Sequence, residues 1–186
     1  MPSEKEKMLA GALYDARDPT LVEERVRATR LCRRFAALDP LDLAARSALL
    51  AELFGAQTDA DIQGSFHCDY GYNVSLGRNV YVNVNCVFLD VNPIRIGNNV
   101  LLGPAVHIFA ASHPLDAAGR RLGLEFGAPV TIQDDVWIGG GAIICPGTTV
   151  GSGSVIGAGS VVTRSIPEGV FAAGNPCRVI RKAIAR

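Results

Sequence analysis

The chain of 186 residues has no surplus of either charge, since lysine plus arginine number 18 and aspartate plus glutamate also number 18. Without a basic field, it gives no indication of binding nucleic acid or an anionic membrane surface. It also lacks an unbroken apolar run of about 18 residues, which a transmembrane helix needs. The first residues, MPSEKEKMLAG, turn charged where a secretory signal peptide carries its apolar segment, so we expect a cytoplasmic protein.

Cysteine is sparse, and the spacing of the cysteines indicates neither disulfide bonds nor a metal site. The five cysteines form no CxxC pair and are odd in number; they stand at positions 32, 68, 86, 145 and 177. We therefore interpret them as reduced side chains in the core, and not as a disulfide framework or a zinc site.

Residues 1–58 are rich in Ala, Leu, Arg and Glu at helical spacing. A first helix is predicted to begin near Asp18 or Thr20, either of which can cap it, with Pro19 in its first turn. The signals predicted for a second helix are Asp39 as N-cap, Pro40 at the first position and Gly55 as a left-handed end. On this evidence alone, the segment is a helical cap on a larger core.

From about residue 60 the period changes to six. Small aliphatic residues recur at that spacing without exception at Ile132, Ile138, Ile144, Val150, Ile156 and Val162, and upstream at Ile96, Leu102 and Ile108. An earlier run, offset by two, comprises Tyr70, Leu76, Val82 and Phe88. Units of one short strand and one turn, each with a single inward aliphatic side chain, indicate a parallel β-helix of stacked coils.

The period fails after Ile108, where the next expected positions hold Pro114 and Arg120. Proline removes a ladder hydrogen bond and arginine would bury an unpaired charge, so an excursion is predicted at about residues 112–128. His113 lies at its start, and an imidazole there can take up a proton near neutral pH. The alternative is that His113 only begins a turn.

A zinc site is the third possibility for the histidines. His107 and His113 lie one six-residue unit apart, which places them on different sides of a coil, so their side chains should not converge on one ion. We predict no metal.

Several longer strings extend beyond the six-residue rule. They are EKEKMLAGALYDA, CDYGYNVSLGRNVYVNVNCVFLDVNPIRIG, HIFAASHPLD, PVTIQDDVWIGGGAIICPGTTVG and AAGNPCRVIRK. With these strings, nearly the whole chain resembles the maltose and galactoside O-acetyltransferases of the hexapeptide-repeat superfamily, and CDYGYN with DVNPIRIG is most similar to the maltose branch.

The resemblance implies a mainly β fold: a left-handed parallel β-helix over residues 59–186, preceded by the helical segment 1–58. It also implies a homotrimer with active sites between neighbouring subunits. In this family the histidine of the excursion is the base, so His113 would deprotonate a sugar hydroxyl, the 6-hydroxyl, for direct attack on acetyl-CoA. No acetyl-enzyme forms in that scheme, and Cys145 would only pack.

The family's substrate contacts fall on Asp69, Asn83 and Asp90. Asn83 and Asn85 are two residues apart and should share one face of a strand with Tyr81; alternatively, Asn85 is a turn residue. The galactoside branch has a second aspartate where this chain has Val91, so that contact is not carried over.

The family's cofactor positions predict that acetyl-CoA lies along the later coils. The residues concerned are Trp137, Gly140, Ala158, Thr163, Arg164, Arg178 and Arg181. The two last arginines would meet phosphate groups, because a guanidinium suits that role; a solvated basic tail is the alternative. Trp137 would flank the same groove, or belong to the core.

The predicted activity is therefore acetyl-CoA-dependent acetylation of a sugar hydroxyl by a homotrimer, with neither nucleic acid nor membrane as a partner. Two other functions stay open from the sequence. One is acetylation of a different acceptor, such as an antibiotic or serine, and the other is a non-catalytic scaffold of the same fold.

Overall fold

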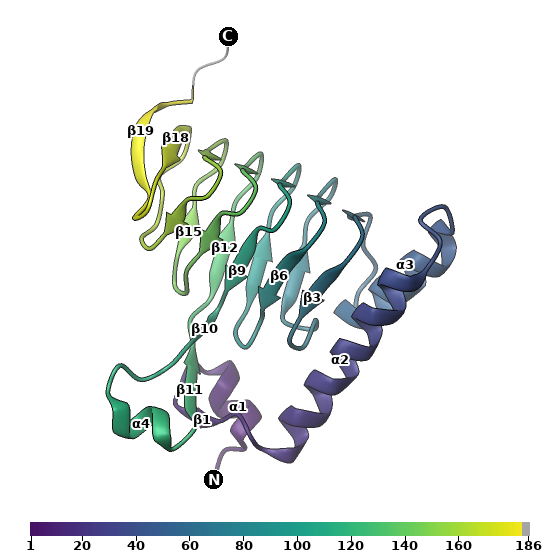
Figure 1. The fold of residues 1–186 in the computed structure, drawn as a ribbon, viewed down its shortest axis with the longest axis vertical. Helices are drawn as coiled ribbons and strands as arrows, with labels where there is room; N and C mark the ends of the chain where they lie inside the picture. Colours follow the sequence, from purple (N-terminus) through teal and green to yellow (C-terminus); the bar gives the residue numbers. More distant parts are fainter. Residues whose placement is uncertain (184–186) are drawn as a thin grey trace.

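The computed structural model describes residues 1–183 and shows a solenoid of β-coils with a helical segment across one end (Figure 1). The helices of this segment are α1 (Glu4–Leu9), α2 (Pro19–Ala37) and α3 (Leu43–Phe54). No helix within residues 1–183 is both long and apolar enough to cross a bilayer.

The helix ends follow from individual capping side chains. The Asp18 carboxylate accepts hydrogen bonds from the amides of Thr20 and Leu21, so Asp18 caps α2, and Gly55 ends α3 with φ 71°, both as predicted. The predicted start of α3 is wrong. Asp39 instead accepts from the Leu41 amide, and the helix begins after Asp42, whose carboxylate accepts from the amide of Ala45.

Parallel strands form the three sheets of the solenoid. A four-stranded sheet comprises β4 (Val74–Leu76), β7 (Ile94–Ile96), β12 (Val130–Ile132) and β15 (Thr149–Val150). A five-stranded sheet comprises β3 (Phe66–Cys68), β6 (Cys86–Leu89), β9 (His107–Phe109), β14 (Ile143–Ile144) and β17 (Val161–Val162). A seven-stranded sheet comprises β2 (Asp61–Ile62), β5 (Tyr81–Val82), β8 (Leu101–Leu102), β13 (Trp137–Ile138), β16 (Val155–Ile156), β18 (Val170–Ala173) and β19 (Arg178–Lys182), of which β19 is antiparallel.

The six-residue period predicted the inward column correctly. Ile132, Ile138, Ile144, Val150, Ile156 and Val162 are all at most 1 % exposed. The offset of the earlier run has a simple cause in coil length. Val82 pairs with Leu102, 20 positions on, whereas Ile138 pairs with Ile156, 18 positions on. Two additional residues in the early turns shift the count without disturbing the stack.

The excursion is an ordered hairpin and not a plain loop. It comprises β10 (Ala111–Ser112), α4 (Ala117–Arg121) and β11 (Leu124–Gly127), and it projects from the lower part of the solenoid (Figure 1). The amide of Ala128 donates to the carbonyl of Ala110 at 2.9 Å, so the chain leaves and re-enters the coil at one point. The stack continues across this neck, where Ile108 pairs with Ile144.

The N-terminal segment reaches the excursion as well as the solenoid. Strand β1 (Tyr14–Asp15) adds to β11, giving a three-stranded antiparallel sheet in the order β1-β11-β10. The Asn92 amide group of the solenoid donates to the Met8 carbonyl at 3.0 Å and so holds the end of α1. The excursion is therefore attached to the rest of the chain on two sides.

Candidate active site

His113 stands directly after β10, at the point where the excursion leaves the sheet. Its side chain is exposed, and its Nδ1 lies 3.4 Å from the carbonyl oxygen of Leu124 on the neighbouring strand. A carbonyl can only accept, so this contact favours the tautomer with the proton on Nδ1 and leaves Nε2 as a free acceptor. Such a hydrogen bond is long in the free protein and can tighten when substrate binds.

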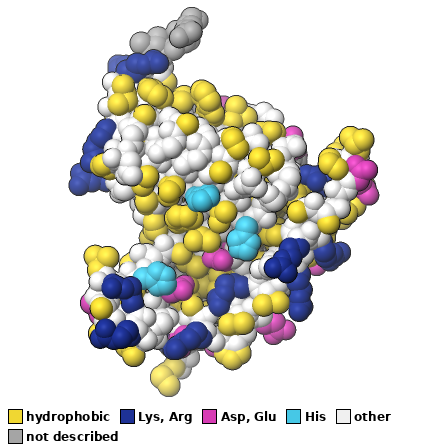
Figure 2. All heavy atoms as spheres, viewed as in Figure 1, with side chains coloured by type: hydrophobic (Ala, Val, Ile, Leu, Met, Phe, Trp, Pro, Cys, Tyr) yellow, Lys and Arg dark blue, Asp and Glu magenta, His cyan; other side chains and the backbone are white. Residues whose placement is uncertain are grey.

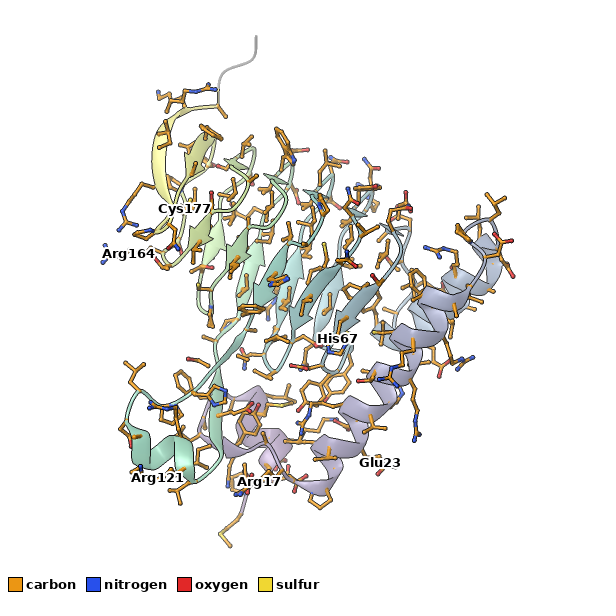
Figure 3. All side chains as sticks on the ribbon, in the orientation of Figure 1. Arg17, Glu23, His67, Arg121, Arg164 and Cys177 are labelled. Atoms are coloured by element: carbon orange, nitrogen blue, oxygen red, sulfur yellow. The ribbon has the colours of Figure 1, made fainter. Side chains whose placement is uncertain are left out.

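Asp69 directly follows strand β3 on the solenoid and is partly buried. Burial raises the pKa of its carboxyl to about 6; Arg25 opposes this shift and the Glu125 carboxylate adds to it. His67 lies nearby on β3, with Nε2 at 4.0 Å from Oδ1 of Asp69. Figure 2 shows the histidines on this face with acidic side chains between them, and Figure 3 shows His67 on β3.

Asp90 does not present its carboxylate to a ligand. It is fully buried, and its two oxygens accept from the amides of Tyr70 at 2.9 Å and Gly71 at 2.8 Å. Burial raises the pKa of Asp90 to about 6, which the amide of Tyr70 partly offsets. The structure thus places this predicted substrate residue beneath the surface, where it shapes the turn after Asp69.

Asn83 and Asn85 do not share a strand face, because β5 ends at Val82. Asn85 is in the left-handed conformation, with φ 62°, and its side-chain carbonyl accepts from the Ser65 hydroxyl. The turn interpretation of Asn85 therefore holds in place of the strand interpretation. Asn83 begins the same turn, is half-buried, and uses Oδ1 to accept from the amide of Val84 at 2.8 Å.

The predicted site residues fall on two edges of the five-stranded sheet. Asp69 follows the end of β3 and His113 lies beyond the end of β9, directly after β10, whereas Asn83 lies in the turn that enters β6. The whole of β6 separates these edges, about 13 Å at the usual rise of a strand. One chain therefore does not bring Asn83 to His113.

The edge that carries Asn83 continues into a partly exposed apolar stripe. In register across the seven-stranded sheet, the outward residues are Tyr81, Leu101, Trp137, Val155 and Phe171. Trp137 is 53 % exposed, so it does not belong to the core.

Beside the stripe lie Gly140 and Ala158, and the Gly159 amide donates to the Gly140 carbonyl at 3.0 Å. A Cβ on the adjacent Gly139 would lie 2.6 Å from the nitrogen of Ala158, so only glycine permits this close stacking.

Two arginines close the upper end of the stripe. Arg178 is opposite Ala173 and Arg181 is opposite Phe171, with an irregularity in register between them. Their partners are two residues apart, so both arginines occupy the same face of the hairpin. The Arg181 guanidinium lies 5.3 Å from the centre of the Phe171 ring.

Thr163 and Arg164 lie elsewhere, in the exposed turn after β17. They share the edge of Asp69 and not that of Gly140. The predicted cofactor residues are therefore divided between the same two edges as the predicted substrate residues.

Sequence reasoning missed Tyr14 and Glu125, whose side chains join the N-terminal segment to the excursion. The Tyr14 hydroxyl donates to Glu125 at 2.8 Å across 111 positions of sequence. Neither residue lies in the six-residue repeat, so no periodic signal relates them. Within residues 1–183, no group of three or more His, Cys, Asp or Glu side chains is placed to hold a metal ion.

Comparison with known proteins gives a consistent result. Residues 7–57 match the family described as maltose acetyltransferase hexapeptide capping motif, and residues 129–164 match bacterial transferase hexapeptide (six repeats). Nodulation protein L of Rhizobium leguminosarum bv. viciae is 51 % identical over 95 % of this chain and 94 % of its own.

Two solved structures extend the likeness to the whole fold. A maltose O-acetyltransferase from Clostridium difficile 630 is 49 % identical, with a TM-score of 0.95 and 99 % of both chains covered. A hexapeptide-repeat-containing acetyltransferase of Vibrio cholerae O1 biovar eltor, complexed with acetyl-coenzyme A, is 38 % identical, with a TM-score of 0.90 over 99 % of this chain and 100 % of that one. The fold of these relatives is the hexapeptide-repeat left-handed β-helix, as the family resemblance implied.

Proposed function

The chain belongs to the maltose O-acetyltransferase family of hexapeptide-repeat acetyltransferases, and from this premise we propose that it acetylates a sugar hydroxyl, the 6-hydroxyl, with His113 as general base. The observation that carries the proposal is the contact of His113 Nδ1 with the Leu124 carbonyl, which leaves Nε2 free to accept a proton. The acetyl-CoA bound by the Vibrio cholerae relative supports this compound as the donor.

The chain's own part in the reaction is proton transfer and positioning. Acetyl-CoA supplies an activated acyl carbon. His113 Nε2 takes the proton of the sugar hydroxyl as its oxygen bonds to that carbon, and the imidazolium then returns the proton to the leaving sulfur. A base placed in this way contributes about 10²–10⁴-fold in rate. The step balances without an acetyl-enzyme, so none of the cysteines takes part.

On the acceptor side, Asp69, Tyr81 and Asn83 are the residues we assign to the sugar. A carboxylate and an amide orient hydroxyl groups well, because they accept and donate in fixed directions. The Nδ2 of Asn83 is still available for this, since its Oδ1 makes the bond to Val84. Asn85 and Asp90 take a structural role instead, in the turn and beneath Asp69 respectively.

The separation of the two edges supports a site that is shared between copies of the chain. His113 and Asp69 on one subunit would face the edge with Asn83, Trp137 and Gly140 on its neighbour. A cyclic trimer forms such a pairing at each of its interfaces. Acetyl-CoA would then lie along the apolar stripe, with its phosphates toward the arginines of β19.

The test is His113→Ala, assayed by thiol release from acetyl-CoA in the presence of maltose, glucose and galactosides. We expect kcat to fall at least about 10²-fold while acetyl-CoA affinity is kept. Arg121→Ala, in the same excursion but exposed on α4, is the matched control and should keep normal turnover. A His113→Ala enzyme with near-normal kcat would refute the base, and no sugar-dependent thiol release by the parent enzyme would refute the acceptor class.

A further inference from the structure

Strand β11 lies between the strand that leads to His113 and a strand from the N-terminus. On one side, Ser112 of β10 pairs with Phe126; on the other, Tyr14 and Asp15 of β1 pair with Glu125 and Leu124. Each of these two ladders is only two residues long. The position of β11, and with it the Leu124 carbonyl beside His113, therefore depends on a small number of bonds.

A side-chain hydrogen bond between Tyr14 and Glu125 also joins the N-terminal segment to β11. Tyr14 is 1 % exposed, and its hydroxyl lies 2.8 Å from Oε2 of Glu125. Burial, followed by the hydrogen bond to Glu125, raises the pKa of Tyr14 well above its usual range. The phenol therefore stays protonated and always donates to the carboxylate. A hydrogen bond to a charged acceptor is stronger than a neutral one.

Other contacts hold the segment around Tyr14 in place. The Arg17 guanidinium donates to both carboxylate oxygens of Asp15 at 2.9 Å, and also to the carbonyl of Leu122 at 2.9 Å. Gly11 has φ 70°, and a Cβ there would lie 2.9 Å from the carbonyl oxygen of Gly127. Gly11 thus lies against the C-terminal end of β11, and Arg17 binds Leu122 just before its N-terminal end. Figure 3 shows Arg17 in this part of the molecule, below the solenoid.

We propose that Tyr14 is a positioning residue for acetyl transfer: by binding Glu125 it holds β11 where the Leu124 carbonyl selects the Nδ1-protonated tautomer of His113. The inference rests on the proposed role of His113 as base. In water, neutral imidazole prefers its proton on Nε2, and in that form Nε2 cannot accept from a sugar hydroxyl. The contact at 3.4 Å has little tolerance, because a small retreat of β11 would exceed hydrogen-bonding distance.

The test is Tyr14→Phe, which removes only the hydroxyl. We expect kcat to fall about 10- to 100-fold, since small displacements of a catalytic group cost that much, with the KM for acetyl-CoA changed less than about twofold. The imidazole ¹³Cδ2 and ¹⁵N shifts of His113, assigned by comparison with His113→Ala, should move toward the Nε2-protonated tautomer. This readout needs no turnover.

Tyr72→Phe is the matched control. The Tyr72 hydroxyl donates to Glu24 at 2.6 Å, so this variant also removes a tyrosine–glutamate bond, but one that does not touch β11. It should keep both kcat and the His113 shifts of the parent. If Tyr14→Phe does not fold, Arg17→Ala replaces it. The Arg17 side chain is 70 % exposed, and its loss should move the His113 shifts in the same direction.

The outcomes separate this inference from the function on which it rests. Unchanged His113 shifts in Tyr14→Phe, or an equal change in Tyr72→Phe, would overturn the role of Tyr14 even if kcat fell. A fully active His113→Ala enzyme would instead overturn the proposed base. Loss of activity in His113→Ala, together with normal kcat and shifts in Tyr14→Phe, would leave the base intact and remove only the positioning step.

Discussion

Replacing both Arg178 and Arg181 by alanine tests whether the end of the apolar stripe binds the phosphates of acetyl-CoA. Both side chains are exposed and lie on one face of the β18–β19 hairpin. The phosphates are distant from the reacting carbonyl, so they should bind equally well in the ground state and the transition state. Loss of such uniform binding raises KM and leaves kcat unchanged.

The expected magnitude follows from the exposure of the two arginines. An exposed ion pair contributes at most about 1 kcal/mol, so two such contacts contribute at most about 2 kcal/mol. That free energy corresponds to an increase of up to about 30-fold in the KM for acetyl-CoA. The Arg181 guanidinium also packs over the Phe171 ring, so Arg181→Ala alone should have the larger effect of the two single variants.

The assay is steady-state thiol release with acetyl-CoA varied at saturating acceptor, repeated at several salt concentrations. Salt should raise the KM of the parent enzyme more than that of the double variant, because only the parent keeps contacts that salt screens. Arg30 and Arg33, two exposed arginines three apart on α2, provide a control with the same loss of charge. An unchanged acetyl-CoA KM in the Arg178/Arg181 variant would refute the placement and make β19 a solvated tail, with Arg164 the next candidate.

Two further predictions concern the assembly and the core. If the chain forms the proposed trimer, mixed trimers of His113→Ala and Asn83→Ala chains, formed by dissociation and reassociation, should regain part of the activity that each variant lacks, because some interfaces then pair two intact edges. No recovery would argue for a site within one chain. Burial raises the pKa of Asp90 in the folded protein to about 6, above that of an aspartate in the unfolded chain, so ionisation of Asp90 opposes folding. The free energy of unfolding should therefore decline as the pH rises from about 4 to above 6. Denaturant titrations should show this decline, on the order of 2 kcal/mol, reduced in Asp90→Asn; equal pH slopes in both proteins would contradict the assigned shift.

The repeat could be predicted from the sequence because every sixth position holds an aliphatic residue that faces the core. Each unit places an aliphatic side chain inward at this position, so Ile138 or Val150 identifies its coil with no knowledge of its neighbours. The excursion was predictable for the same reason, since Pro114 and Arg120 cannot occupy the column. Its internal structure was not, because α4 and β11 follow no period that the sequence displays.

Some short sequence patterns are compatible with two local conformations, and only the structure shows which one forms. Asp39 and Asp42 each meet the requirements of an N-cap, and the helix begins after the second. The sequence YVNVNC alternates like a strand, yet Asn85 adopts a left-handed turn. The pairing of Tyr14 with Glu125 depends on the fold bringing distant segments together. The residues next to them in sequence do not predict the start of this helix, the turn at Asn85 or the contact of Tyr14 with Glu125.

The closed neck at Ala110 and Ala128 has a consequence for how the excursion can vary between relatives. Since the coils stack across the neck as if nothing were inserted, the excursion could be lengthened or exchanged with little effect on the solenoid or the apolar stripe. However, β11 also pairs with β1 from the N-terminus. The excursion and the N-terminal segment therefore form one structural unit: a graft of residues 111–127 between two relatives should fold correctly only when the first 17 residues travel with it.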